Sequence, residues 1–143
     1  MGHGDKLCVC DCNFPAKEVA THTTSGKLVE LIGVDLPRAL DAICSVLPLD
    51  FFVETPAQHM AAQMGVSMPE LGHEVIADAQ NALTRHCGSD AAILLKPLER
   101  FSFYAEARTC FAVVQTMERR PYGNVILVKG VVGPDGKDLR PVS

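Results

Sequence analysis

The sequence predicts an α/β domain of three layers, in which helices cover both faces of a mixed, mostly parallel β-sheet. Two observations predict this fold class. Short apolar runs rich in β-branched residues alternate with segments of helical periodicity along the chain. The strand-like runs are apolar at consecutive positions, which is typical of strands that are buried on both faces. With 143 residues, 48% of them hydrophobic, the chain has the size of one domain.

The expected elements of the first third of the chain follow in order. Lys6 to Cys12 is an apolar run that ends at Asn13-Phe14-Pro15, so we expect a buried strand that leads into a loop. No regular element is expected from there to about Gly33. Asp35 and Pro37 are a favourable N-cap and first-turn pair for a helix that should stop before Pro48.

The remainder of the chain continues the alternation of strands and helices. The expected strands are Leu49 to Val53, Ala91 to Leu95, Cys110 to Met117 and Asn124 to Val132; the expected helices are Pro69 to Cys87, ended by Gly88, and Phe101 to Arg108. The Met-rich segment between residues 56 and 69 is interpreted as a variable connection. We expect one domain over residues 1–132 and a surface tail over residues 133–143, where turn residues replace the hydrophobic period.

Composition excludes several classes of function. The net charge is −4 and charges of both signs are interspersed, so the chain lacks the basic patch that nucleic acids or anionic membranes require. No run of apolar residues is long enough to span a bilayer, and the first residues do not resemble a signal peptide. We therefore expect a cytoplasmic protein with reduced cysteines and a small polar ligand.

Two short motifs at opposite ends of the chain could carry chemistry. His3 precedes the first expected strand and Asp11 ends it, and an imidazole near a carboxylate can move protons at neutral pH. Tyr122-Gly123-Asn124 leads into the last expected strand and offers a hydroxyl and an amide for sugar hydroxyls. Taken alone, a loop histidine is more often structural, and Tyr122 to Asn124 could be a simple β-turn.

Cys8, Cys10 and Cys12 form a C-x-C-x-C series that suggests a metal site. On a strand all three would share one face, with successive thiols about 6 to 7 Å apart, which is wider than two thiolates on one zinc ion. We therefore expect small apolar packing, and we assign no metal to the chain.

Four separated blocks of the sequence, taken together, resemble the L-fucose mutarotase and D-ribose pyranase family, and in particular its fucose branch. They are Met1-Gly2-His3-Gly4-Asp5 with Asp11 and Phe14-Pro15-Ala16; Leu47-Pro48-Leu49-Asp50; Glu99-Arg100-Phe101-Ser102-Phe103-Tyr104 with Phe111-Ala112-Val113-Val114; and Tyr122-Gly123-Asn124 with Lys129-Gly130-Val131. Their order and spacing are more specific than any one motif. The resemblance covers residues 1–132.

The resemblance implies an enzyme that opens and recloses the ring of a monosaccharide, without a metal or an organic cofactor. It implies that His3 transfers protons and that Asp11 binds the sugar. It implies further substrate contacts from Arg100, Tyr122 and Asn124, with Gly123 between the last two. The position of Arg100 is arginine in the fucose branch and histidine in the ribose pyranases, so the resemblance favours L-fucose. Members of this family are ring-shaped homo-oligomers, typically decamers, whose active sites lie at subunit contacts.

The chain departs from the fucose branch in three places. The branch has Arg-Ala-Asp-Gly where this chain has Glu30-Leu31-Ile32-Gly33, the segment from Pro56 to Pro69 matches poorly, and this sequence starts at the block that a helix precedes in the relatives. Because the chain has no Trp, Phe14, Phe103 or Tyr104 would have to stack on the sugar. Three alternatives stay open: a ribose pyranase, a monosaccharide-binding protein without catalysis, and a thiol-based metal or redox protein.

Overall fold

A computed structural model describes residues 1–88 and 95–142. These residues form six strands and four helices, which alternate along the chain up to β5, the strand that β6 follows without a helix between them. The elements are β1 (Lys6–Cys10), α1 (Ala16–His22), β2 (Lys27–Glu30), α2 (Leu36–Cys44), β3 (Ala57–Ala61), α3 (Glu70–Cys87), β4 (Lys96–Glu99), α4 (Arg100–Ala107), β5 (Ala112–Gln115) and β6 (Val125–Val128).

The strands form one mixed sheet in the order β2-β5-β1-β6-β3-β4. Three neighbouring pairs are parallel: β1 with β5, β2 with β5, and β3 with β4. β6 lies between β1 and β3 and is antiparallel to both. The mixed, mostly parallel sheet predicted from the sequence is therefore confirmed.

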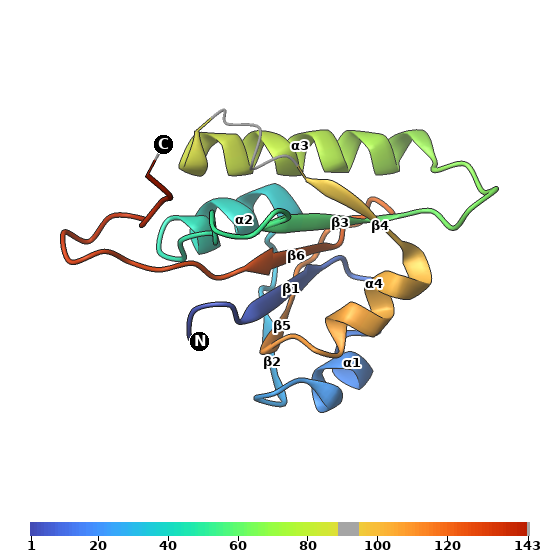
Figure 1. The fold of residues 1–143 in the computed structure, drawn as a ribbon. Helices are drawn as coiled ribbons and strands as arrows, with labels where there is room; N and C mark the ends of the chain where they lie inside the picture. Colours follow the sequence, from blue (N-terminus) through green and yellow to red (C-terminus); the bar gives the residue numbers. More distant parts are fainter. Residues whose placement is uncertain (89–94, 143) are drawn as a thin grey trace.

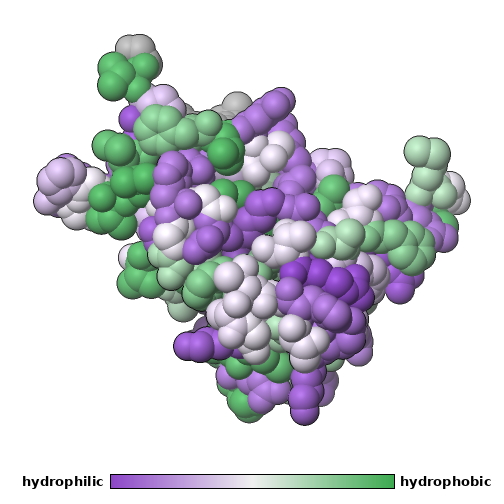
Figure 2. Space-filling model, turned by 60° about the horizontal axis from the view of Figure 1, so that its bottom comes forward, coloured by the Kyte–Doolittle hydropathy of each residue, from purple (hydrophilic) through white to green (hydrophobic). Residues whose placement is uncertain are grey.

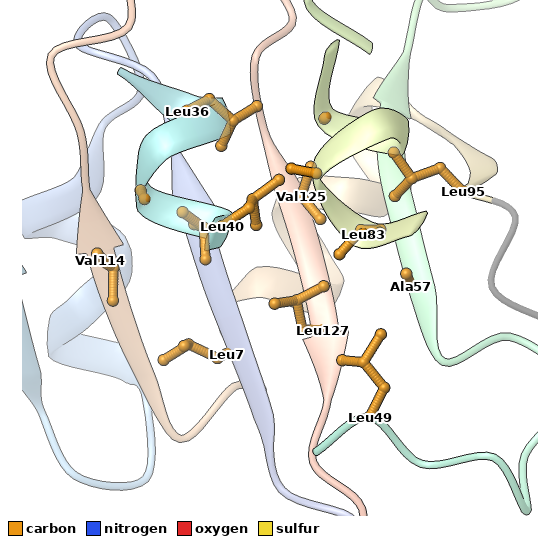
Figure 3. Close-up of a cluster of buried hydrophobic side chains, with 14 of the residues drawn as sticks. Leu7, Leu36, Leu40, Leu49, Ala57, Leu83, Leu95, Val114, Val125 and Leu127 are labelled. Atoms are coloured by element: carbon orange, nitrogen blue, oxygen red, sulfur yellow. The ribbon is translucent and has the colours of Figure 1, made fainter. Parts of the chain in front are cut away.

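Helices cover both faces of this sheet, as Figure 1 shows. Successive side chains of β1 point to opposite faces: Leu7 and Val9 pack in one buried cluster with α2 and α3, whereas Cys8 and Cys10 pack in another with α1 and α4. Figure 3 shows the first cluster, in which Leu36 and Leu40 of α2 and Leu83 of α3 lie over the strands. The predicted three layers follow from these two cores.

The two helices with clear capping residues form as expected. Asp35 caps α2, because its carboxylate accepts a hydrogen bond of 3.1 Å from the backbone N–H of Arg38. α3 ends at Cys87, and Gly88 follows with a φ of 90°, a conformation that glycine adopts without strain.

Three segments of the first half differ from expectation. Residues 16–33, predicted to be irregular, contain α1 and β2; β2 is a strand at the sheet edge with mostly exposed side chains, so it has no apolar pattern. The segment between residues 56 and 69, predicted to be a connection, contains β3. The strand predicted at Leu49 to Val53 is wrong, since only Leu49 makes an isolated bridge, to Lys129.

The other boundaries shift by a few residues. The strand predicted at Lys6 to Cys12 ends at Cys10, because the chain turns at Asp11, and Cys12 is exposed instead of sharing the face of Cys8 and Cys10. Most of the strand predicted at Ala91 to Leu95 lies outside the described residues, and β4 follows directly after it.

The surface matches the composition. In Figure 2 hydrophilic and hydrophobic residues are intermingled over the face in view. None of the helices in the described ranges is both long enough and apolar enough to cross a membrane. In residues 133–142 the chain folds back on itself, since Leu139 donates a backbone hydrogen bond of 2.9 Å to the carbonyl of Val131.

Candidate functional site

Asp11 stands directly after β1, at the point where the chain turns away from the sheet. One carboxylate oxygen, Oδ1, accepts hydrogen bonds from the backbone N–H groups of Asn13, at 3.0 Å, and Phe14, at 2.9 Å. Burial raises the pKa of Asp11, while these N–H groups oppose the rise because they stabilise the charged carboxylate. The side chain is thus held in one orientation by the backbone of its own loop.

Asn124 precedes β6 and is tied to the Asp11 loop. Its side-chain oxygen accepts a hydrogen bond of 2.8 Å from the backbone N–H of Asp11, and its amide nitrogen lies 3.6 Å from the sulfur of Met60 in β3. Both residues are almost fully buried. Because β1, β6 and β3 are neighbours in the sheet, this contact joins three strands at the rim of the site.

Tyr122 and Gly123 shape the loop in front of β6. Tyr122 has a φ of 64°, the left-handed conformation that side chains other than glycine rarely adopt. At Gly123 an added Cβ would lie 2.9 Å from the Cγ of Glu118, which real Cβ contacts do not tolerate without a shift. The backbone strain at Tyr122 persists only because the surrounding structure holds the residue in this conformation, which is typical of functional sites.

The buried carboxylate of Glu118 stabilises this loop through hydrogen bonds with Arg120. Arg120 donates to both of its oxygens, at 3.1 Å from Nε and 3.0 Å from Nη2, and also to Asp78 of α3 at 2.7 Å. Burial raises the pKa of Glu118, but the hydrogen bonds from Arg120 outweigh it and leave that pKa below its ordinary value. Glu118 and Arg120 lie two residues apart in the same loop, whereas Asp78 belongs to α3, so the sequence alone does not indicate that the three side chains meet.

Arg100 reaches the site from the first residue of α4. Glu99 caps this helix through hydrogen bonds of 3.1 Å from the backbone N–H groups of Phe101 and Ser102. The guanidinium lies 5.8 Å from the ring centre of Tyr104, and the neighbouring Tyr104 hydroxyl raises the pKa of Arg100, which stays charged. Tyr104 in turn stacks on Phe14 with ring centres 5.3 Å apart.

These side chains line one cavity of about 230 Å³. Its walls are Asp11, Asn13, Phe14, Met60, Arg100, Tyr104, Pro121, Tyr122 and Asn124. Four of the six predicted site residues therefore meet although they lie far apart in the sequence; the other two, His3 and Gly123, do not line the cavity. The mixture of one carboxylate, one guanidinium, hydroxyls, two amides and aromatic rings suits a small polyhydroxylated ligand.

His3 does not line this cavity. It precedes β1 whereas Asp11 follows it, and the five residues of that strand alone span roughly 16 Å. The imidazole is half exposed, and its Nε2 lies 3.0 Å from Oδ2 of the buried Asp50. Asp50 borders a second cavity of about 260 Å³, at the opposite end of β1 from the first. Within one chain the predicted proton-transferring residue is thus separated from the predicted sugar contacts.

Of the aromatic residues considered for sugar stacking, Phe14 and Tyr104 line the first cavity, while Phe103 is buried in the core. Sequence reasoning did not single out Asn13, Met60 or Pro121, which also line it. Met60 belongs to β3, in the segment that the sequence predicts to be a connection. Asn13 and Pro121 lie next to residues of the predicted motifs, and this position in the sequence is the one feature that could have pointed to them.

The thiols do not form a metal-binding group. The hydrogen bond to Cys10 and burial raise the pKa of Cys8, and burial raises the pKa of Cys110 to about 12, so both sulfurs stay protonated at neutral pH. Over residues 1–88 and 95–142 no three His, Cys, Asp or Glu side chains are grouped as metal ligands.

The chain is similar to known proteins over nearly its whole length. A fucose mutarotase from Danio rerio is 40% identical over 139 residues, which cover 94% of this chain and 84% of the relative. A fucose mutarotase from Homo sapiens is 38% identical over 134 residues, which cover 92% of this chain and 82% of the relative. The crystal structure of a fucose mutarotase in complex with L-fucose from Streptococcus pneumoniae superposes with a TM-score of 0.78 at 32% identity, covering 93% of this chain and 87% of that one. Residues 1–132 match the RbsD / FucU transport protein family, and the chain therefore belongs to that family.

Proposed function

We propose that this chain is a mutarotase that interconverts the α and β anomers of L-fucose. The observation that carries the proposal is the single cavity in which Asp11, Arg100, Tyr122 and Asn124 meet. The names of the relatives support the same activity, since proteins from fish and human that are more than a third identical to this chain are called fucose mutarotases.

The reaction needs only a proton transfer and room for rotation. The proton leaves the C1 hydroxyl and one is gained by the ring oxygen, while the bond between C1 and the ring oxygen breaks and the open aldehyde forms. After rotation about the bond to C1 the ring closes on the other face. Both oxygens are attached to C1, so a single imidazole, which can accept a proton and then donate it, can serve them in turn.

The cavity supplies orientation and charge. Asp11 is fixed by its own loop and can accept hydrogen bonds from sugar hydroxyls, and Tyr122 and Asn124 lie beside it. Arg100 carries a permanent positive charge, which favours the negative charge that develops on oxygen as the ring opens. Phe14 and Tyr104 offer an apolar surface to the ring carbons.

His3 enters the proposed site from a second copy of the chain. It is half exposed at the far end of β1 from the cavity, so a neighbouring subunit has to bring it to the sugar. This agrees with a ring-shaped homo-oligomer, for which we propose a decamer, with active sites at subunit contacts. For its cellular setting we propose the cytoplasm, where the six free thiols would stay reduced.

Exchange between anomers, followed by saturation-transfer NMR on fucose, ribose and other aldoses, tests the activity. We expect fucose exchange to be accelerated at enzyme concentrations far below that of the sugar, and more strongly than ribose exchange. Faster exchange of ribose would identify a pyranase instead. Binding of fucose without accelerated exchange would identify a sugar-binding protein.

Mixing two inactive variants tests the shared site. His3→Gln and Asp11→Asn should each lose activity, but random co-assembly of the two should restore about a quarter of the sites, namely those that combine the intact His3 of one copy with the intact Asp11 of another. A mixture that stays inactive after co-assembly would contradict a site built from two subunits.

A further inference from the structure

Asp50 is a buried carboxylate whose oxygens both have defined partners. Its side chain is 3% exposed, against 53% for that of His3. Oδ1 accepts a hydrogen bond of 3.1 Å from the backbone N–H of Phe52, and Oδ2 meets Nε2 of His3 at 3.0 Å. A carboxylate is rarely buried unless it is paired, so the contact with His3 is the interaction that compensates for the burial of Asp50.

The backbone brings these two side chains together. The loop of His3 is tied to Lys129, whose carbonyl accepts from Gly4 at 2.9 Å and whose N–H donates to the carbonyl of Asp5 at 2.8 Å. On the other side Gly130 donates to the carbonyl of Pro48 at 2.8 Å. A Cβ at Gly130 would lie 2.3 Å from the carbonyl oxygen of Leu49, so only glycine permits this approach. The segment after β6 thus fixes the loop of His3 and the loop of Asp50 relative to each other.

Other charges near Asp50 are directed elsewhere. Lys6 lines the same cavity, but its ammonium pairs with Glu106 of α4. Asp5, in the loop of His3, accepts a hydrogen bond of 2.6 Å from the backbone N–H of Gly2. Within the described part of the chain, His3 is the basic side chain within ion-pair distance of Asp50.

We propose that Asp50 is a positioning residue that fixes the tautomer of His3. A carboxylate accepts a hydrogen bond, so neutral His3 carries its proton on Nε2, facing Asp50, and presents the lone pair of Nδ1 outward. Nδ1 is then the atom that takes the proton from the C1 hydroxyl and passes it to the ring oxygen while the bond between C1 and the ring oxygen breaks. This assignment rests on the proposed function, in which His3 acts on the sugar of a neighbouring subunit.

The tautomer can be measured without any activity. Long-range ¹H–¹⁵N correlation spectra of ¹⁵N-labelled protein, at a pH where the imidazole is neutral, identify the protonated nitrogen, and the spectrum of His3→Gln assigns the signals. We expect the proton of His3 on Nε2 in the wild type. In Asp50→Asn, which keeps the shape and can still accept from Phe52, the other tautomer should become populated. Asp5→Asn, the matched control in the His3 loop, should leave the tautomer unchanged.

The kinetic arm measures anomer exchange of fucose. With the fold intact, Asp50→Asn should lower kcat on the order of 10- to 100-fold with little change in KM, since the residue orients the proton carrier without touching the sugar. A wild-type proton on Nδ1, or full kcat in Asp50→Asn despite an altered tautomer, would overturn the proposal. If the proton is on Nε2 but the wild type exchanges no sugar, the mutarotase function fails, and the role of Asp50 in the reaction fails with it.

Discussion

We propose that Arg100 is the residue that selects fucose over ribose. It lines the cavity beside Tyr104 and stays charged, whereas a histidine there would offer fewer donors and would titrate near neutral pH. We predict that Arg100→His lowers fucose turnover and shifts relative activity toward ribose, with little effect on the free energy of unfolding, because the side chain is exposed. The ratio of exchange rates for the two sugars measures the shift; an unchanged ratio would mean that another residue discriminates.

Cys8 and Cys10 are packing residues in this structure, buried in the cluster that α1 and α4 cover. We predict that replacing either by Val leaves fucose exchange unchanged and alters stability by less than about 1.5 kcal/mol, since the swap is close to volume-conserving. Elemental analysis of the wild type and both variants provides the second readout. A stoichiometric metal that disappears with the thiol would revive the thiol-site alternative.

At the residue scale, the sequence predicted four of the residues that line the cavity, but it did not predict that His3 lies outside it. The family resemblance assigned Asp11 and Asn124 to one site, and the hydrogen bond between them joins the strands that they flank. The separation of His3 from the cavity differs from the expectation that its imidazole lies near the carboxylate of Asp11. It follows from the length of β1, which lies between His3 and Asp11 in the order that the sequence already indicates.

The loop between β5 and β6 is the element that presents Tyr122, and the pair of Glu118 and Arg120 braces it. Removing the arginine would leave a buried carboxylate without its partner, which is strongly destabilising. We predict that Arg120→Gln lowers the free energy of unfolding by about 3 kcal/mol at neutral pH and raises the KM for fucose. Arg119→Gln, at the exposed neighbouring position, is the matched control and should change neither quantity appreciably.

The pH dependence of this loss provides a sharper measurement. The folded-state pKa of Glu118 is below its ordinary value, so the stabilisation it contributes is present above that ordinary value and is lost as the pH falls through the folded-state pKa. Urea unfolding at a series of pH values should therefore show the difference between Arg120→Gln and the wild type shrinking in acid. A difference that is constant with pH would show that the carboxylate is not the origin of the loss.

At the element scale, predictions succeeded where local signals were strong. The Asp35 cap and the Gly88 end defined α2 and α3, and continuous apolar runs marked β1, β5 and β6. β2 was missed because an edge strand with exposed side chains lacks an apolar pattern. The apolar run Leu49 to Val53 predicts a strand, but the chain turns there, where the Asp50 side chain accepts a hydrogen bond from the backbone N–H of Phe52.

At the scale of the whole molecule, the family match ends at residue 132 while the chain continues to residue 143, so the end of the folded domain has to be located. We propose one domain over residues 1–132 with a surface tail. The tail nevertheless touches the domain: the Arg140 guanidinium lies 4.1 Å from the ring centre of Phe51 and donates a hydrogen bond of 2.8 Å to the carbonyl of Cys87. These contacts connect the tail to the end of α3 and to the loop that carries Asp50.

We predict that deleting residues 133–143 leaves a single cooperative unfolding transition and an active enzyme, and lowers the free energy of unfolding by about 1 to 3 kcal/mol, the range expected for one cation–π contact and one hydrogen bond. Arg140→Gln in the full chain should reproduce most of this loss, because the guanidinium makes both contacts. Urea unfolding at fixed protein concentration, which keeps any self-association comparable, measures the difference. Two separate transitions, or a truncated chain that cannot fold, would show instead that the tail is an integral part of the domain.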